Sequence, residues 1–386
     1  MEMKTLGTVA TYINGRAFKP SEWEKAGMPI IRIQNLTSEN APYNYAKGVF
    51  EEKYIVHNGD LLFAWSASLG AHIWKGQDAW LNQHIFKVLP KEGIDRDYLY
   101  YFLLAVVAEL YAKTHGSGMV HITKAPFMNT PIPVPSLPEQ ERIVARIEEL
   151  FSQLDAGVET LKKTKAQLAV YRQAVAEDAI ATAKHRGATV LPFGTFVLQY
   201  QNGISKRSGE GIQTPVLRLA DIENQRISND DGLRLIGLSK IERDRFVLKR
   251  GDLLIVRVNG SENNVGRSIV VDKDDSYAAC DHFIRCSVDF SHIIPEYAQL
   301  LLDSFSARKH IKENMVSSAG QNTVSQTTMS SIMIYVPNIS VQEKIMASVN
   351  ERLSVCDSIE QTVDTALQQA EAMRQSILKQ AFGGAL

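Results

Sequence analysis

The chain has 386 residues, a hydrophobic fraction of 45% and a formal net charge of −1. This length predicts two or more domains, and the composition is that of folded protein. No apolar run approaches the roughly 18 residues of a membrane span, and the first residues lack the apolar stretch of a signal peptide. The near-neutral charge argues against a nucleic-acid binder, unless a partner supplies much of the phosphate contact.

The number and spacing of the cysteines indicate the cellular compartment and whether a metal site is expected. Cys280, Cys286 and Cys356 form neither a metal-ligand spacing nor a disulfide framework. Thiols of this kind stay reduced in the cytosol. We therefore expect a cytoplasmic protein without a disulfide or a resident metal.

The first 136 residues predict a mixed α/β unit. A helix is expected over Tyr98–Lys113, and a proline-bounded strand over Pro131–Pro135 ends the unit. Runs rich in β-branched and aromatic residues predict further strands at Ile30–Ile33, Leu61–Ala64 and His84–Val88.

A long helix follows, over residues 137–184. Ser136 is a suitable N-cap with Pro138 in the first turn, and Lys184-His185-Arg186-Gly187 provides basic residues and a glycine at the end. Apolar residues recur every seven positions at Ile147, Leu154, Leu161, Leu168 and Val175, with Ile143, Leu150 and Tyr171 on the alternate seam position. This pattern predicts a helix packed against another helix.

The second half repeats the first. Asn14-Gly15 recurs as Asn202-Gly203, and Gly-Asp-Leu-Leu at 59–62 recurs at 251–254. Residues 185–338 therefore predict a second α/β unit, with a helix over Glu296–Asn314. Its expected strands are Val216–Leu219, Leu253–Val258 and Phe283–Val288. A second heptad helix follows over 339–386, with its seam at Val349, Cys356, Val363, Ala370 and Ile377, plus Ile345 and Met373.

We interpret the two long helices as an antiparallel intrachain coiled coil that holds two similar globular units, related by a pseudo-two-fold repeat. Each helix would be about 65–70 Å long at 1.5 Å per residue. The alternative is a long surface helix packed on its own domain. Two similar units predict two similar binding sites. Segments that diverge between the copies, such as 34–55 and 220–247, suggest that the two sites bind different targets.

Motifs for catalysis are missing. The sequence has no phosphate-binding Gly-x-x-x-x-Gly-Lys-Ser/Thr loop, and Gly116-Ser117-Gly118 lacks the strand–turn–helix context of a dinucleotide site. Asn40-Ala41-Pro42-Tyr43 differs by one residue from the Asn-Pro-Pro-Tyr loop of adenine methyltransferases, but no cofactor motif precedes it, so a turn is expected. His84 and His282 recur in equivalent strands, as framework residues or as DNA contacts.

Several pieces together resemble the specificity subunit of type I restriction–modification systems. They are Pro133-Val134-Pro135-Ser136-Leu137-Pro138-Glu139-Gln140-Glu141-Arg142-Ile143, its weaker echo at 336–345, the Gly-Asp-Leu-Leu strand entry, and the loops at 116–122 and 319–324. The second junction lacks the Pro-Glu-Gln form. The resemblance covers essentially the whole chain.

The resemblance implies a non-catalytic DNA reader. Residues 1–136 and 185–338 would be target-recognition domains, each reading one half of a split target in the major groove. Segments 137–184 and 339–386 would be helical spacers that dock two methyltransferase subunits. Those partners would hold S-adenosylmethionine and methylate adenine, restriction subunits would cleave DNA, and this chain would hold no cofactor itself.

Candidate DNA contacts are polar or basic residues in or beside divergent segments, which can donate to bases or phosphates. In the first unit they are Arg16, Lys19, Gln34, Asn35, Lys47, Ser66, Ser68, His121 and Lys124. In the second unit they are Lys206, Arg207, Arg226, Arg257, Asn259, Asn263, Asn264 and Arg267. Arg32 and Arg218 recur in matched strands and suit structural pairing equally well.

Two other classes of protein compete with the DNA reader. One is a self-contained DNA adenine methyltransferase fragment, which the absent motifs disfavour. The other is a coiled-coil scaffold for proteins only, which divergent loops on a shared framework disfavour. The target sequence and its spacer cannot be read from the chain.

Overall fold

A computed structural model describes residues 2–384 except 39, 67, 114–123, 224–225, 228–231 and 275. The chain forms two compact units, Met1–Lys162 with Asp364–Leu386 (unit 1) and Lys163–Val363 (unit 2). Each unit therefore combines a globular part with segments of both long helices. Among the described residues, no helix has the length and apolar character needed to cross a membrane.

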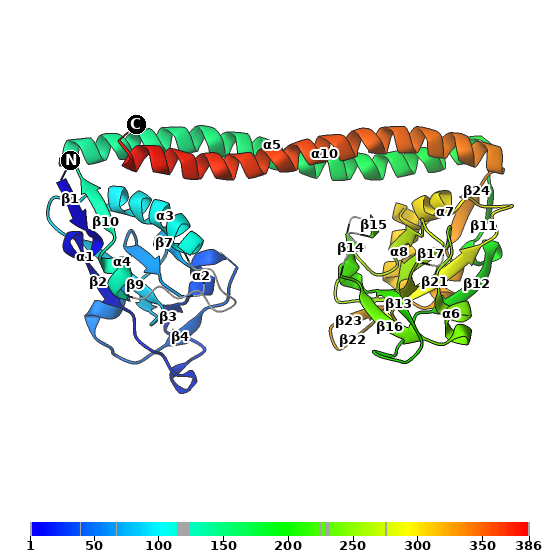
Figure 1. The fold of residues 1–386 in the computed structure, drawn as a ribbon, viewed down its shortest axis with the longest axis horizontal. Helices are drawn as coiled ribbons and strands as arrows, with labels where there is room; N and C mark the ends of the chain where they lie inside the picture. The colour runs from blue at the N-terminus through cyan, green and yellow to red at the C-terminus, as the bar shows by residue number, and fades with distance from the viewer. Residues whose placement is uncertain are drawn as a thin grey trace. The chain divides into compact units, whose positions relative to one another are not determined.

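Unit 1 is built from three sheets and short helices (Figure 1). An antiparallel sheet has the order β2-β9-β6-β7, a mixed sheet has the order β4-β3-β8-β5, and β1 pairs with β10. The strands are β1 Glu2–Thr5, β2 Ala10–Asn14, β3 Met28–Ile31, β4 Asn44–Ala46, β5 Ile55–Val56, β6 Leu61–Ala64, β7 Gly70–Ile73, β8 Ala79–Leu81, β9 Ile85–Pro90 and β10 Pro131–Val134. The helices are α1 Leu6–Val9, α2 Ile33–Thr37, α3 Arg96–Lys113, α4 Lys124–Met128, and the 3-10 turns η1 Pro20–Glu22 and η2 Glu52–Tyr54.

Unit 2 repeats this plan. Its sheets have the orders β12-β21-β17-β19 and β16-β13-β20, and β11 pairs with β24. The strands are β11 Thr189–Pro192, β12 Val197–Asn202, β13 Ile212–Leu217, β16 Arg234–Leu238, β17 Leu253–Val256, β19 Ser268–Val270, β20 Ala278–Ala279, β21 Phe283–Val288 and β24 Met333–Val336. The helices are α6 Lys240–Phe246, α7 Pro295–Leu302, α8 Phe305–Asn314, α9 Gln326–Ser330, and the 3-10 turns η3 Phe193–Phe196 and η4 Leu219–Asp221.

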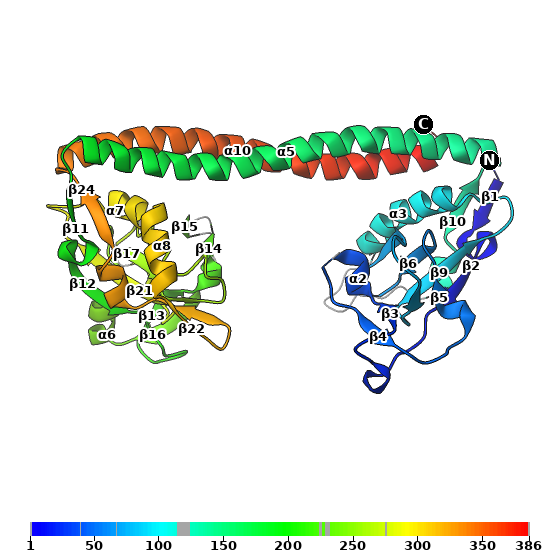
Figure 2. The same ribbon diagram turned by 180° about the vertical axis from the view of Figure 1, so that it is seen from behind.

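Two small sheets in unit 2 add to the repeated plan. One is the hairpin of β14 Ile222–Glu223 and β15 Arg226–Ile227. The other has the order β18-β23-β22, from β18 Val258–Asn259, β22 Val316–Ser318 and β23 Gln321–Thr323. Within this unit the β18-β23-β22 sheet and α6 lie at the end away from the two long helices (Figures 1 and 2).

The repeated Gly-Asp-Leu-Leu motif is a turn that enters a buried strand. Gly59 and Gly251 have φ of +89° and +86°, a backbone conformation that favours glycine. The following aspartate pairs with a basic residue on the neighbouring strand, Asp60 with Lys87 at 2.7 Å and Asp252 with Arg285 at 2.6 Å. The motif recurs because the same backbone conformation and the same ion pair recur.

A buried glutamine fixes the start of each long helix to its globular part. The Gln140 side chain donates to the carbonyls of Gly93 and Pro135 and accepts from the amide of Asp95, each at 2.9 Å. Gln342 makes the equivalent bonds in unit 2, to the carbonyls of His292 and Pro337 and from the amide of Ile294. Both side chains are fully buried.

The long helices α5 (Leu137–His185) and α10 (Ile339–Phe382) lie side by side (Figures 1 and 2). In unit 1 Asp155 contacts Arg374. In unit 2 Arg172 meets Asp357 at 2.7 Å, and Asp178 meets Arg352 at 2.6 Å. In these ion pairs, residues later in α5 contact residues earlier in α10, so the two helices are antiparallel. The expected α/β class and helix pair are therefore confirmed.

Several details differ from expectation. The helix expected over 296–314 is two helices: α7 ends at Leu302 with Asp303 as its C-cap, and Ser304 caps α8 by accepting from the amide of Ala307 at 3.3 Å. Strands expected to reach Ile33 and Leu219 end sooner, because Asn35 and Asp221 accept from the amides of Arg32 and Arg218 and start short helices. Two seam positions, Tyr171 and Met373, are exposed at 43% and 55%.

Candidate nucleic-acid interface

In unit 2, the segment 257–267 carries polar side chains, and its first part includes β18, which pairs with β23. Asn263, Asn264 and Arg267 are exposed, whereas Arg257 and Asn259 are half-buried. Arg257 Nη1 donates to the carbonyl of Asp281 at 3.2 Å, and Asn259 Oδ1 accepts from the amide of Ser261 at 2.8 Å. A guanidinium has five donors, so this one bond leaves Arg257 capacity for a base or a phosphate.

The segment is held in place by its neighbours. Asn259 pairs with Asn322 across β18 and β23, and the Asn322 side chain donates to the carbonyl of Gly260 at 3.1 Å. Arg267 Nε and Arg308 Nη2 both donate to the carbonyl of Asn263, at 3.0 and 2.9 Å. Donors presented on a fixed backbone can be aimed at a ligand without further ordering.

The hairpin β22–β23 belongs to the same surface, although its residues are not among the predicted DNA contacts. Ser317, Ser318 and Gln321 are exposed on it, and its turn uses Ala319 and Gly320 at φ of 49° and 75°. A two-stranded ribbon has dimensions that the major groove admits. The signal available in the sequence was a small-residue turn between two short polar runs.

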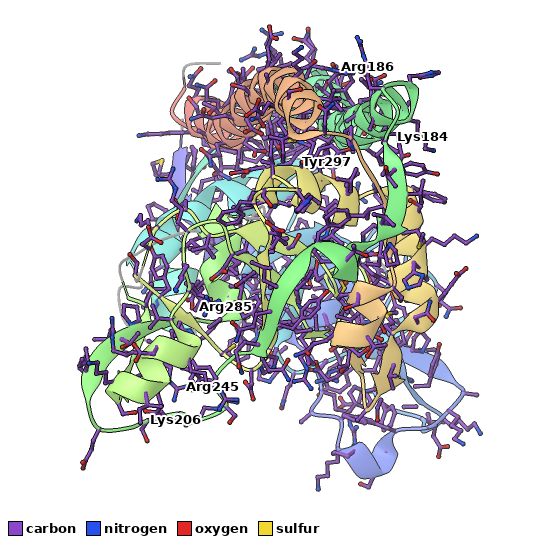
Figure 3. All side chains as sticks on the ribbon, turned by 90° about the vertical axis from the view of Figure 1, so that its right-hand side faces the viewer. Lys184, Arg186, Lys206, Arg245, Arg285 and Tyr297 are labelled. Atoms are coloured by element: carbon purple, nitrogen blue, oxygen red, sulfur yellow. The ribbon has the colours of Figure 1, made fainter. Side chains whose placement is uncertain are left out.

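A second polar region surrounds α6. Lys206 Nζ lies 2.5 Å from Glu242, which holds the pKa of that carboxyl to about 2, aided by bonds from Ser239. Lys206 is therefore partly neutralised, whereas Arg207 is exposed. Figure 3 shows Lys206 and Arg245 near α6, and Lys184 and Arg186 beside the long helices at the other end of unit 2. Arg226 lies on β15, and its side chain is outside the described part of the chain.

In unit 1, only some of the candidates are available at the surface. Lys19, Gln34, Lys47 and Ser68 are exposed. Arg16 lies 2.5 Å from Glu22 and packs over the ring of Phe50 at 4.1 Å. The ion pair and the ring contact give Arg16 a role in the fold.

Two other unit 1 candidates lie in the interior. Asn35 is 8% exposed and donates to the carbonyls of Ala41 and Pro42, and Ser66 is 2% exposed. Their burial removes them from the surface that DNA would meet. His121 and the side chain of Lys124 lie outside the described residues.

The matched residues outside the candidate set have local partners. Arg218 forms an ion pair with Asp221 at 2.8 Å, and Arg32 lies over the ring of Trp23 at 5.4 Å. His84 and His282 both close a turn before a central strand and are half-buried. The ion pair and the ring contact support a framework role for Arg218 and Arg32.

The sequence of this chain is similar to those of known DNA specificity subunits. The profile of the Type I restriction modification DNA specificity domain matches residues 1–169. The StySPI specificity subunit of Salmonella potsdam is 28% identical over 99% of this chain and 88% of its own length. The EcoBI specificity subunit of Escherichia coli is 26% identical over 99% and 85%.

A solved structure from a study of complex assembly and conformational transition in a type I R-M system has the same fold. It aligns with a TM-score of 0.71 at 17% identity, over 100% of this chain and 98% of that one. Residues 1–169 therefore match the Type I restriction modification DNA specificity domain, and the chain as a whole is similar to type I restriction enzyme specificity subunits.

Proposed function

We propose that this chain reads a bipartite DNA target, with one half-site contacted by residues 1–136 and the other by residues 185–338. The supporting observation is a duplicated framework whose exposed polar segments differ between the copies. In unit 1 those side chains are Lys19, Gln34, Lys47 and Ser68, and in unit 2 they are Arg207 and the residues of the segment 257–267. Base edges in the major groove distinguish all four base pairs.

Arg257 is the proposed base contact in unit 2. Its backbone amide donates to the carbonyl of His282 at 2.7 Å, and its own carbonyl accepts from Val324 at 2.9 Å. The backbone is fixed on both sides, so the guanidinium starts from a defined position. Bidentate contact of arginine with guanine is the commonest specific contact in the major groove.

Methylation and cleavage would belong to partner subunits. The long helices would set the distance between half-sites and dock two methyltransferase subunits, which hold S-adenosylmethionine, and restriction subunits would complete the complex. Exposed apolar side chains on the helix pair of unit 2 support docking, since such patches often mark interfaces. They are Val170 at 68%, Val355 at 57% and Ile359 at 40% exposure.

The test is DNA binding by the complex with its methyltransferase partner, on a library of target variants. Arg257→Ala should relax preference at one base pair of one half-site by about 5- to 150-fold, from roughly 1–3 kcal/mol per bidentate contact. Arg250→Ala is the matched control, an exposed arginine of the same unit outside the segment. Unchanged preference in Arg257→Ala would contradict this contact, and a chain that methylates DNA alone would contradict the non-catalytic role.

A further inference from the structure

A cluster of three side chains in unit 2 is not used by the proposed function. Cys280, Asp281 and His282 lie between β20 and β21, where the amide of Phe283 donates to the carbonyl of Cys280 at 3.0 Å and closes a turn. Their sulfur, carboxylate and imidazole ligand atoms all lie within 4.8 Å of one another. The turn brings together side chains that an extended strand would point to opposite faces.

The distances suit one tetrahedral ion. His282 Nδ1 lies 3.3 Å from Asp281 Oδ1 and 3.9 Å from Cys280 Sγ. Ligands at about 2.0–2.3 Å from a tetrahedral zinc ion are about 3.3–3.6 Å apart. The nitrogen–oxygen spacing already fits, and the sulfur, 3.9 Å from the nitrogen and within 4.8 Å of the carboxylate, must move closer when an ion binds. We propose that Cys280, Asp281 and His282 bind one divalent transition-metal ion of the zinc type, leaving its fourth position open.

The ligand chemistry favours such an ion. A thiolate and a carboxylate together balance a divalent charge, and sulfur with imidazole selects borderline metals over magnesium or calcium. Cys280 is 6% exposed. Burial, with a smaller effect from the charge of Asp281, raises the pKa of its thiol, although the amide of His282 and the charge of Arg207 act in the opposite direction. The ion would displace the thiol proton, which metal binding requires.

A nucleophilic triad does not fit the same residues. Thiol–imidazole catalysis uses one ring nitrogen for the thiol and the other for the orienting carboxylate. Here Cys280 and Asp281 both face Nδ1 of His282. One atom facing two ligand partners is the arrangement of a shared ion.

Unit 1 shows that the fold does not need the thiol and carboxylate. The same turn occurs at Asn82-Gln83-His84, closed by the amide of Ile85 on the carbonyl of Asn82 at 3.1 Å. Asn82 and Gln83 occupy the positions of Cys280 and Asp281 with neutral amides. The backbone therefore forms without metal ligands, and only unit 2 carries the ligand set. The spacing of the three cysteines did not predict this site, because the site uses only one thiol.

The ion would stiffen a segment that holds Arg257. The carbonyl of Asp281 accepts from Arg257 Nη1, and the carbonyl of His282 accepts from the Arg257 amide at 2.7 Å. This consequence rests on the proposed function, whereas the metal site itself does not.

The experiment is titration of the purified full-length chain with Co²⁺, without DNA. A sulfur-to-cobalt charge-transfer band should saturate at one equivalent and disappear when Zn²⁺ is added. The double variant Cys280→Asn with Asp281→Gln should lose the band and at least 10-fold in affinity. It copies the turn of unit 1, so it should retain its far-ultraviolet circular dichroism and melting temperature.

His282→Gln should also weaken Co²⁺ binding at least 10-fold. Cys356→Ala, a thiol buried in the helix pair, should keep the band. Absence of the band in the native chain, or its persistence in the folded double variant, would overturn the site. Because no DNA enters this measurement, failure of the proposed DNA reading would leave its outcome unchanged.

Discussion

Gly15 and Gly203 lie where two backbones approach too closely for a side chain. A Cβ at Gly15 would overlap the carbonyl of Asn82, and one at Gly203 would overlap the carbonyl of Cys280. The repeated glycine is therefore explained by steric contact with the turn between β8 and β9 in unit 1 and between β20 and β21 in unit 2. By contrast, nothing lies within 4 Å of a Cβ at Gly157, in the middle of α5.

Replacing glycine by alanine should therefore have opposite effects on stability at Gly203 and at Gly157. Gly203→Ala should destabilise unit 2 by more than about 3 kcal/mol, since backbone must move to admit the methyl group. Gly157→Ala should stabilise by about 0.5–1 kcal/mol, since alanine is the better helix former. Urea unfolding of the full chain checks both. A neutral Gly203→Ala would contradict the close approach.

Gln342 is fully buried, and its side chain satisfies two backbone carbonyls and one backbone amide. Gln342→Ala should cost about 2–4 kcal/mol, because buried polar groups left unpaired cost about 1–3 kcal/mol each and neighbours relax in part. Gln380, an exposed glutamine later in the same helix, is the control and should change stability by less than about 0.5 kcal/mol when replaced by alanine. Equal effects at the two positions would contradict the anchoring role.

Protonation of Asp289 should lower the stability of unit 2 at acid pH. Bonds from Ser291 and His292 lower the pKa of its carboxyl from 3.8 to about 2. A carboxyl whose pKa is lowered in the folded state stabilises the fold at pH values above its ordinary pKa. This contribution is lost as the pH falls from about 4 to 2. Asp289→Asn should therefore be less stable than the native chain at pH 7 and lose less on acidification. Urea midpoints at pH 7 and pH 3 measure the difference, and parallel losses would refute it.

At the scale of elements, the antiparallel pair explains why both helices keep a heptad register. Val175 and Ala179 of α5 and Val349 and Met346 of α10 belong to the core of unit 2. Ile147 of α5 and Leu378 of α10 belong to the core of unit 1. Each helix contributes to both cores, so a change in length must be made in both helices to keep the facing residues aligned.

The helices are proposed to set the gap between half-sites. Four residues inserted after Thr164 and four after Asp364 add nearly one helical turn to each helix, about 6 Å at 1.5 Å per residue. The methylated target should keep both half-sites and gain one or two base pairs between them, at about 3.4 Å per base pair. Methylation mapping in cells that express the variant with its partner gives the result.

Two inserted residues serve as the control. They turn the seam by about 200° and should impair folding or assembly. An active four-residue variant with an unchanged gap would show that the helices do not set the spacing.

At the scale of the molecule, duplication predicts modular recognition. Replacing residues 185–338 with the corresponding part of the StySPI subunit should change one half-site and leave the other unaltered. The exchange keeps β11 and β24, which pair from Thr189–Val336 to Pro192–Met333, within one segment. Methylation mapping reads the outcome, with exchange of residues 1–136 as the reciprocal variant. A change in both half-sites would refute modularity.

The sequence alone determined the repeat, the two helices and most central strands. Their signals are local: a proline and caps at the ends, a heptad period between them, and glycine where φ is positive. The bounds of α5 and α10, Leu137–His185 and Ile339–Phe382, match the predicted limits closely. The resemblance to type I specificity subunits rests on the order and register of these same signals.

Only the tertiary structure decided which polar residues are available at the surface. Asn35, Ser66 and Arg16 looked like donors, but burial, backbone bonds and an ion pair engage them. The β22–β23 hairpin joined segment 257–267 through pairing across many intervening residues, which no local pattern encodes. The Cys280–His282 cluster required a tight turn that places neighbouring side chains together. Exposure and side-chain proximity depend on chain segments distant in sequence, so they become defined only when the chain folds.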